Sequence, residues 1–163
     1  MSFYTEQIYG VWKLVSFNIY RADDPSGKPI LQPLGESPLG RIIFLPSGYM
    51  NVYMTSPGRA ANIASPAWHL ATEAELAYAA KNVTMYCGPF EIYEENGETR
   101  VDTHVDVSLD PSWIGSHQIR RVEGIYDENE RPILTLTPLK EFSLPDGTVT
   151  IARITWEKVK NVT

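Results

Sequence analysis

The chain has 163 residues, of which 43% are hydrophobic and 21% are charged, and 20 acidic against 14 basic side chains give it a net charge of −6. This composition speaks against a disordered chain. The richest basic run, Arg120-Arg121, is followed at once by Val122-Glu123, so the basic patch of a nucleic-acid-binding protein is missing and we expect no such partner.

Cysteine content and the start of the chain bear on its compartment. Cys87 is the single cysteine, so no internal disulfide can form. The segment from Met1 to Glu6 lacks the basic region and apolar run of a signal peptide, and no stretch approaches the ~18 apolar residues of a membrane span. We therefore expect a cytoplasmic protein that does not cross a membrane.

Alternating apolar and polar residues, separated by Pro- and Gly-containing turns, predict a chain of β-strands. Turn motifs such as Pro46-Ser47-Gly48 mark tight connections between them. No repeat or change in composition marks a linker, so residues 1–163 are predicted to form one domain. The eight predicted strands are Val11 to Tyr20, Arg41 to Leu45, Tyr49 to Thr55, Met85 to Glu94, Thr99 to Leu109, Gln118 to Tyr126, Ile133 to Leu139 and Val149 to Lys158.

One segment has helical features instead. Thr72 and Glu75 have the spacing of a capping box, and the run that follows is rich in Ala and Leu and ends at Lys81. This pattern predicts a short helix between the third and fourth strands, where it could cover one end of a barrel.

Eight strands in sequence-adjacent order can close into a barrel, which removes exposed sheet edges. An immunoglobulin-like sandwich is the competing architecture, but its Cys–Trp–Cys core is absent. We therefore predict an all-β protein, an eight-stranded antiparallel up-and-down barrel whose interior holds side chains or one small ligand.

The strand from Thr99 to Leu109 carries the strongest candidate for chemistry. Its alternation puts His104 between Asp102 and Asp106 on one face and a row of valines on the other. If the polar face points inward, His104 could act as a general acid or base, supported by Asp106. If the valine face points inward, as is usual in barrels, His104 is a surface residue.

Arg120 shares a strand face with Gln118 and could line the same interior. A buried Arg needs an anionic partner, and Asp106 on the preceding strand is a candidate. The pair could position a ligand carbonyl or carboxylate, or could simply be a structural bridge.

Further candidates for ligand binding are aromatic or polar side chains. Tyr49 and Tyr53 alternate with Met50, Val52 and Met54, so one of these two faces lines the interior. Trp68 and Trp113 lie on connections, where each could line the mouth of the barrel or fill a gap. The full predicted set of ligand-binding residues is Tyr49, Tyr53, Trp68, Tyr86, Trp113 and Gln118.

Motifs for metals and cofactors are missing. His69, His104 and His117 lie far apart in the sequence and show no His-Glu-x-x-His or His-x-His spacing. No glycine-rich nucleotide motif and no nucleophile elbow is present. We expect neither a metal nor a cofactor.

Several stretches resemble a known family. They are Gly10-Val11-Trp12, Pro38 to Phe44 with Pro46 to Met50, the block His104-Val105-Asp106-Val107-Ser108 with Pro111, Trp113, Gly115, Gln118 and Arg120-Arg121, and the closing Ile154 to Val159. Together they make the chain similar to the lipocalin-like domain family of bacteria and fungi. The resemblance implies a barrel with a cavity, and some fungal members are cyclases or isomerases of secondary metabolism.

Two functions follow as hypotheses. The first is a cofactor-free cyclase or isomerase that acts on a small, largely apolar natural product, with His104, Asp106 and Arg120 as its catalytic residues. The second is a non-catalytic carrier that uses the same cavity. A packed interior without a ligand is a third reading, and a homodimer remains an open alternative to a monomer.

Overall fold

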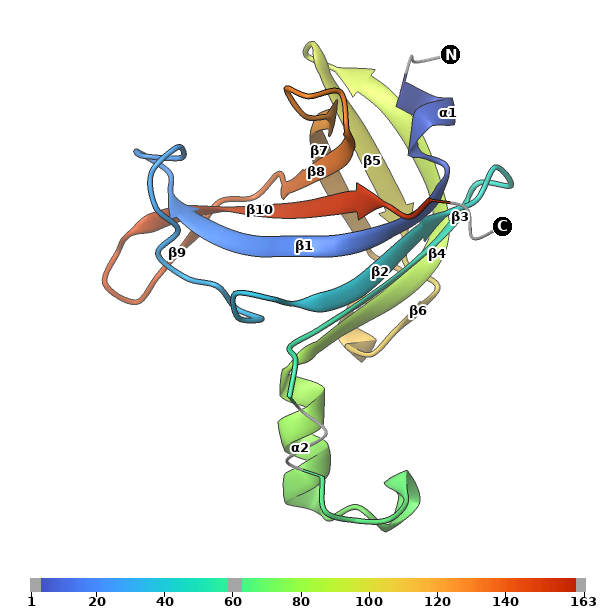
Figure 1. Ribbon diagram of the computed structural model, residues 1–163, viewed down its shortest axis with the longest axis vertical. Coiled ribbons are helices and arrows are strands. Elements are labelled where there is room, and N and C mark those ends of the chain that lie inside the picture. The colour runs from blue at the N-terminus through green and yellow to red at the C-terminus, as the bar shows by residue number, and fades with distance from the viewer. Residues whose placement is uncertain (1–3, 59–62, 161–163) are drawn as a thin grey trace.

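The computed structural model describes residues 4–58 and 63–160. Eight long strands close into an antiparallel barrel, which confirms the predicted fold (Figure 1). They are β1 (Gly10–Arg21), β2 (Leu39–Phe44), β3 (Tyr49–Thr55), β4 (Val83–Glu95), β5 (Glu98–His104), β7 (His117–Tyr126), β8 (Pro132–Pro138) and β10 (Val149–Lys158). They neighbour one another in chain order, and β10 pairs back with β1.

Short elements complete the chain. The strand β6 (Val107–Ser108) pairs with β4, and β9 (Phe142–Ser143) pairs with β10. The helices are α1 (Tyr4–Ile8) and α2 (Glu73–Lys81), with single 3₁₀ turns at η2 (Trp68–Leu70) and η3 (Pro111–Trp113).

A β-bulge in β1 changes which side chains face the interior. Leu14 pairs with Trp156 but Ser16 pairs with Thr155, so Val15 is an extra residue, and its side chain is exposed. The extra residue reverses the alternation beyond it. Strict alternation along the predicted strand from Val11 to Tyr20 places Val11, Val15, Phe17 and Ile19 on one face and Trp12 and Leu14 on the other. That expectation is wrong, because Phe17 and Ile19 also pack inward.

The predicted fifth strand is interrupted. It forms β5 and β6, separated by Val105 and Asp106. At this break the Asp106 N–H donates to the Cys87 carbonyl at 2.9 Å, and the neighbouring Gly88 lies directly against the chain. A Cβ added to Gly88 would stand 1.9 Å from the His104 carbonyl oxygen, so only glycine fits there without a backbone shift.

One end of the barrel is closed by side chains. Helix α1 covers it, with Ile8 fully buried and its carbonyl accepting a 2.8 Å hydrogen bond from the Trp12 indole. Phe44 and Phe90 pack edge to face at the same end, with ring centroids 5.1 Å apart. The opposite end, near Thr55, Val83, His117 and Pro138, is the one we call the mouth.

Helix α2 begins with the predicted capping box. Glu75 N–H donates to Thr72 Oγ1 at 3.3 Å, and Thr72 N–H donates to Glu75 Oε2 at 2.7 Å. The helix does not cover the barrel as expected. Residues 63–82, which we call the arm, extend away from the mouth (Figure 1).

Candidate functional site

The burial of the β5 side chains shows which face of this strand points into the barrel. Val101 and Thr103 are each 2% exposed and belong to the interior. His104 and Asp106 are exposed on the outer face. The valine face therefore points inward, and the alternative that placed His104 in the lumen is wrong.

The mouth half of the barrel holds a cavity of about 120 Å³. Its walls come from every long strand except β5, and η3 contributes one side chain. Among the described residues that line it, Arg120 is the only charged one. The lining consists of Phe17, Ile42, Val52, Met54, Thr84, Tyr86, Trp113, Arg120, Leu136, Pro138, Ile154 and Trp156.

Arg120 is placed by the regular start of β7. Its register partner is Val101, an interior residue, so its side chain also points inward. The guanidinium donates to the Gln118 side-chain oxygen at 3.1 Å and to the Ile119 carbonyl at 3.1 Å. The predicted pair with Asp106 is wrong, because Asp106 lies outside the barrel and accepts a 2.9 Å hydrogen bond from the Tyr49 hydroxyl.

Two predicted aromatic residues meet at the cavity. Tyr86 and Trp113 pack edge to face, with ring centroids 5.5 Å apart. Trp113 is held on η3 by Asp110, whose carboxylate accepts from the Ser112 N–H at 2.9 Å and caps the turn. Trp113 also lines two surface grooves beside the mouth, so it stands between the cavity and solvent.

The other predicted ligand-binding residues do not line this cavity. Gln118 lines the groove beside the mouth and accepts a hydrogen bond from Arg120, which lines the cavity. Tyr49 and Tyr53 project outward, because the methionine face of β3 is the buried one. Trp68 is 62% exposed on the arm, so it neither closes the mouth nor fills a gap in the core.

Hydrogen bonding gives Tyr49 a local role on the outer surface. Its hydroxyl lies 3.6 Å from Cys87 Sγ and 2.9 Å from Asp106 Oδ2. These contacts, with Cys87 first, raise the pKa of Tyr49 above its ordinary value. Tyr49 therefore stays protonated and ties β3 to the segment that follows β5.

Other residues that line the cavity carry weaker signals in the sequence. The bulge in β1 reverses the side on which alternation places Phe17, and alternation along β3 leaves open whether the face of Met54 or that of Tyr53 points inward. Trp156 lies on the closing strand, and its 1% exposure identifies it as core, yet its indole N–H has no hydrogen-bond partner among the described residues. A tryptophan in an alternating strand predicts burial but not an unpaired donor.

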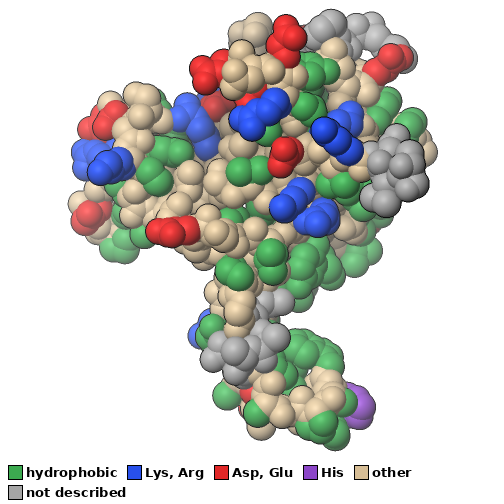
Figure 2. Space-filling view, viewed as in Figure 1, with side chains coloured by type: hydrophobic (Ala, Val, Ile, Leu, Met, Phe, Trp, Pro, Cys, Tyr) green, Lys and Arg blue, Asp and Glu red, His purple; other side chains and the backbone are tan. Residues whose placement is uncertain are grey.

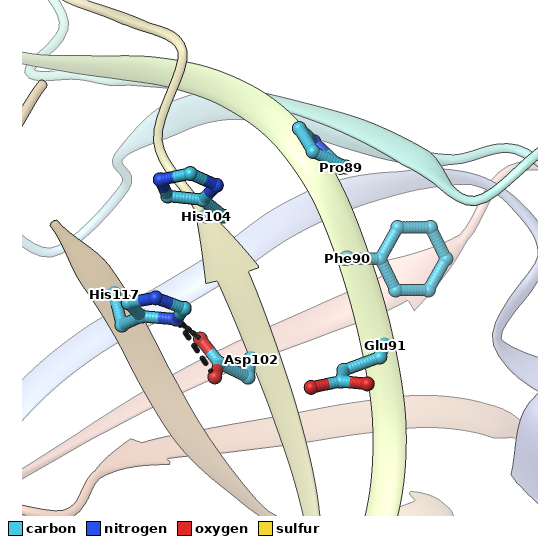
Figure 3. A pocket seen from close by; sticks show the side chains of 6 residues that line it. All are labelled: Pro89, Phe90, Glu91, Asp102, His104 and His117. Atoms are coloured by element: carbon cyan, nitrogen blue, oxygen red, sulfur yellow. Dashed lines mark hydrogen bonds and ion pairs between the residues drawn. The ribbon is translucent and has the colours of Figure 1, made fainter. Parts of the chain in front are cut away.

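His104 lies in a shallow groove of about 230 Å³ on the outer face (Figure 3). Its ring stacks on that of His117 at 5.0 Å, and His117 Nδ1 lies 2.9 Å from Asp102. Glu91 points toward this cluster from β4, whereas Phe90 points to the other side of its strand. Among the described residues no group of three or more His, Cys, Asp or Glu side chains is arranged to hold a metal ion.

No helix in the described part of the chain is long and apolar enough to span a membrane. A search of curated proteins found no match to the chain. The family profile described as lipocalin-like domain matches residues 9–159, which covers the barrel from just before β1 to just beyond β10. The chain therefore belongs to the lipocalin-like domain family.

Proposed function

We propose that this protein is a carrier that binds one small, largely apolar molecule inside the barrel. A lipocalin-like barrel points to small-molecule binding, and the cavity of about 120 Å³ carries the proposal. An apolar cavity of roughly 150 Å³ holds benzene, and this cavity is somewhat smaller, so its ligand is no larger than a small ring or a short alkyl chain. The ligand would contact aromatic and aliphatic walls.

The carrier is favoured over the enzyme by where the acid–base candidates lie. His104 and Asp106 are on the outer face, so they can transfer no proton to a molecule in the cavity. A carrier needs no such group. The ligand would leave the protein unchanged.

A cofactor-free cyclase or isomerase is the second candidate, and one observation favours it. Arg120 and Tyr86 line the same apolar cavity, where a guanidinium and a hydroxyl could stabilise developing negative charge. The two candidates differ in what is recovered after incubation with a ligand. An unchanged ligand supports the carrier, and a product whose formation depends on Arg120 supports the enzyme.

The binding proposal is tested with 1-hexanol and a variant that fills the cavity. Titration should change the tryptophan fluorescence, because Trp113 and Trp156 line the cavity. Val52→Phe places extra volume there, at a cost in stability of about 1–3 kcal/mol, and should abolish the change. Val11→Phe makes the same substitution at a side chain that is 37% exposed and should leave binding intact.

Equal binding by both variants would contradict the proposal, provided that circular dichroism shows both to be folded. Cytoplasmic location and a homodimer stay predictions. Fractionation of the cells that make the protein tests the first, and light scattering of the purified protein tests the second.

A further inference from the structure

We propose that the ligand is a small carboxylate, with an apolar body in the cavity and a charged end that pairs with Arg120 at the mouth. The inference rests on the proposed function, since it assumes that a molecule occupies the cavity. Two features of the mouth carry it, the pairing of Arg120 and the charge of the groove outside it.

The first feature is a positive charge without a counter-ion. Arg120 is half-buried and donates only to neutral oxygens, those of Gln118 and Ile119. No ion pair joins it to a carboxylate within the described ranges 4–58 and 63–160. A guanidinium partly removed from water without an anion is less well compensated than a paired one, so an anion that reaches Arg120 would gain a charge-assisted hydrogen bond.

The neighbouring Arg121 shows how the charge of an arginine on β7 is compensated by carboxylates. Arg121 faces outward and forms ion pairs with Glu98 at 3.2 Å and Glu123 at 3.1 Å. The two arginines are adjacent in sequence, yet only the outer one has carboxylate partners. The protein therefore has acidic side chains available at β7 but places none at the cavity.

The second feature is the groove that leads to the mouth. It has a volume of about 310 Å³ and is lined by Arg120, Lys140 and His117 together with apolar and amide side chains. His117 is paired with Asp102, so Arg120 and the exposed Lys140 supply the positive charge. No Asp or Glu stands among the described residues that line the groove, although the whole chain carries a net charge of −6. A basic groove on an acidic protein attracts anions to the mouth.

Carboxylate chemistry fits these features together. A carboxylate only accepts hydrogen bonds, and it binds a guanidinium through two parallel N–H groups. Gln118 accepts from Arg120 and so holds the guanidinium in place at the mouth. An amine of the same size would be repelled by Arg120, and an alcohol would leave its charge unpaired.

The test compares three ligands of equal chain length on the full chain. Hexanoate, 1-hexanol and hexylamine are titrated while the amide resonances are followed by nuclear magnetic resonance. We expect hexanoate to bind at least about tenfold more tightly than 1-hexanol, because a hydrogen bond to a charged group contributes enough binding free energy for a tenfold difference in affinity. Hexylamine should bind most weakly. Equal affinities for hexanoate and 1-hexanol would overturn the inference while leaving the proposed function standing.

Variants locate the effect. Arg120→Gln should remove the preference for hexanoate over 1-hexanol, and Arg121→Gln, the matched change on the outer face, should keep it. Arg120→Lys retains the charge and should retain part of the preference, which keeps the test usable if Arg120→Gln fails to fold. A preference that survives Arg120→Gln would overturn the inference, and failure of all three ligands to bind would contradict the proposed function itself.

Discussion

At the scale of single residues, Gly88 determines how closely β4 can approach the end of β5. The nearest atoms to a Cβ at this position belong to the backbone, at 1.9 Å for the His104 carbonyl oxygen and 3.1 Å for the Asp106 nitrogen. A flexible side chain could turn aside, but these atoms cannot. The contact fixes the point at which β5 stops and the chain turns toward η3.

Replacing Gly88 with alanine should therefore destabilise the whole barrel. We expect Gly88→Ala to lower the free energy of unfolding by about 1–3 kcal/mol, because the backbone of one strand has to shift. Urea denaturation measures this. Gly124→Ala is the control, since its nearest contact is the Tyr126 carbonyl oxygen at an ordinary 3.6 Å, and a change within about 0.5 kcal/mol is expected there. Equal losses in both variants would show that the close contact is unimportant.

Residue-level predictions succeeded where the strand was regular. Arg120 lies on the inner face with Gln118 and Val122, as alternation predicts, because β7 is undisturbed up to Val122. The partner assigned to Arg120 was wrong for a related reason. Asp106 follows the break after β5, and alternation along a strand carries no information beyond the point where the strand stops.

At the scale of elements, the capping box shows what local sequence can predict. Thr72 and Glu75 make both reciprocal hydrogen bonds, and the carboxylate of Glu75 also accepts from the Ala64 N–H at 2.7 Å and the Ser65 hydroxyl at 2.8 Å. These bonds, led by that from the Thr72 N–H, lower the pKa of Glu75 to about 2. One carboxylate thus joins the start of α2 to the segment before it.

Acid should loosen the arm before it unfolds the barrel. Because the pKa of Glu75 falls from 4.5 to about 2 on folding, its stabilisation is complete above pH 4.5 and is lost as the pH falls toward 2. Glu75→Gln should speed hydrogen exchange of residues 64–81 at neutral pH and leave the barrel strands unchanged. Glu73→Gln removes a first-turn carboxylate outside the capping box and should have a smaller effect. Unchanged exchange in Glu75→Gln would contradict this account.

Element-level prediction failed in β1 because a bulge has no strong sequence signature. The run from Val11 to Ile19 is apolar at many positions, so both phases of alternation are acceptable. Pairing with β10 decides between them by inserting Val15 as an extra residue. Such a choice depends on the partner strand, which lies far away in the sequence.

At the scale of the whole molecule, strand count and short turns were enough to predict closure of the barrel. The position of the arm was not predictable, because helix propensity says nothing about what a helix packs against. Figure 2 shows the arm standing off the barrel with hydrophobic side chains on its surface, and Trp68, Leu70 and Tyr78 are exposed there. The cavity could not be predicted, because its lining is known only when the interior side chains are placed in three dimensions. That residues 1–163 form one domain stays a prediction.

The methionine methyl groups offer the most direct test that the barrel interior binds the ligand. Met54 lines the cavity, whereas Met85 is 39% exposed and lines a surface groove beside α2. With ¹³C-labelled methionine methyl groups, 1-hexanol should shift the Met54 resonance in a saturable manner and leave that of Met85 in place. A saturable shift of Met85 with Met54 unmoved would place the ligand outside the barrel and contradict the central claim.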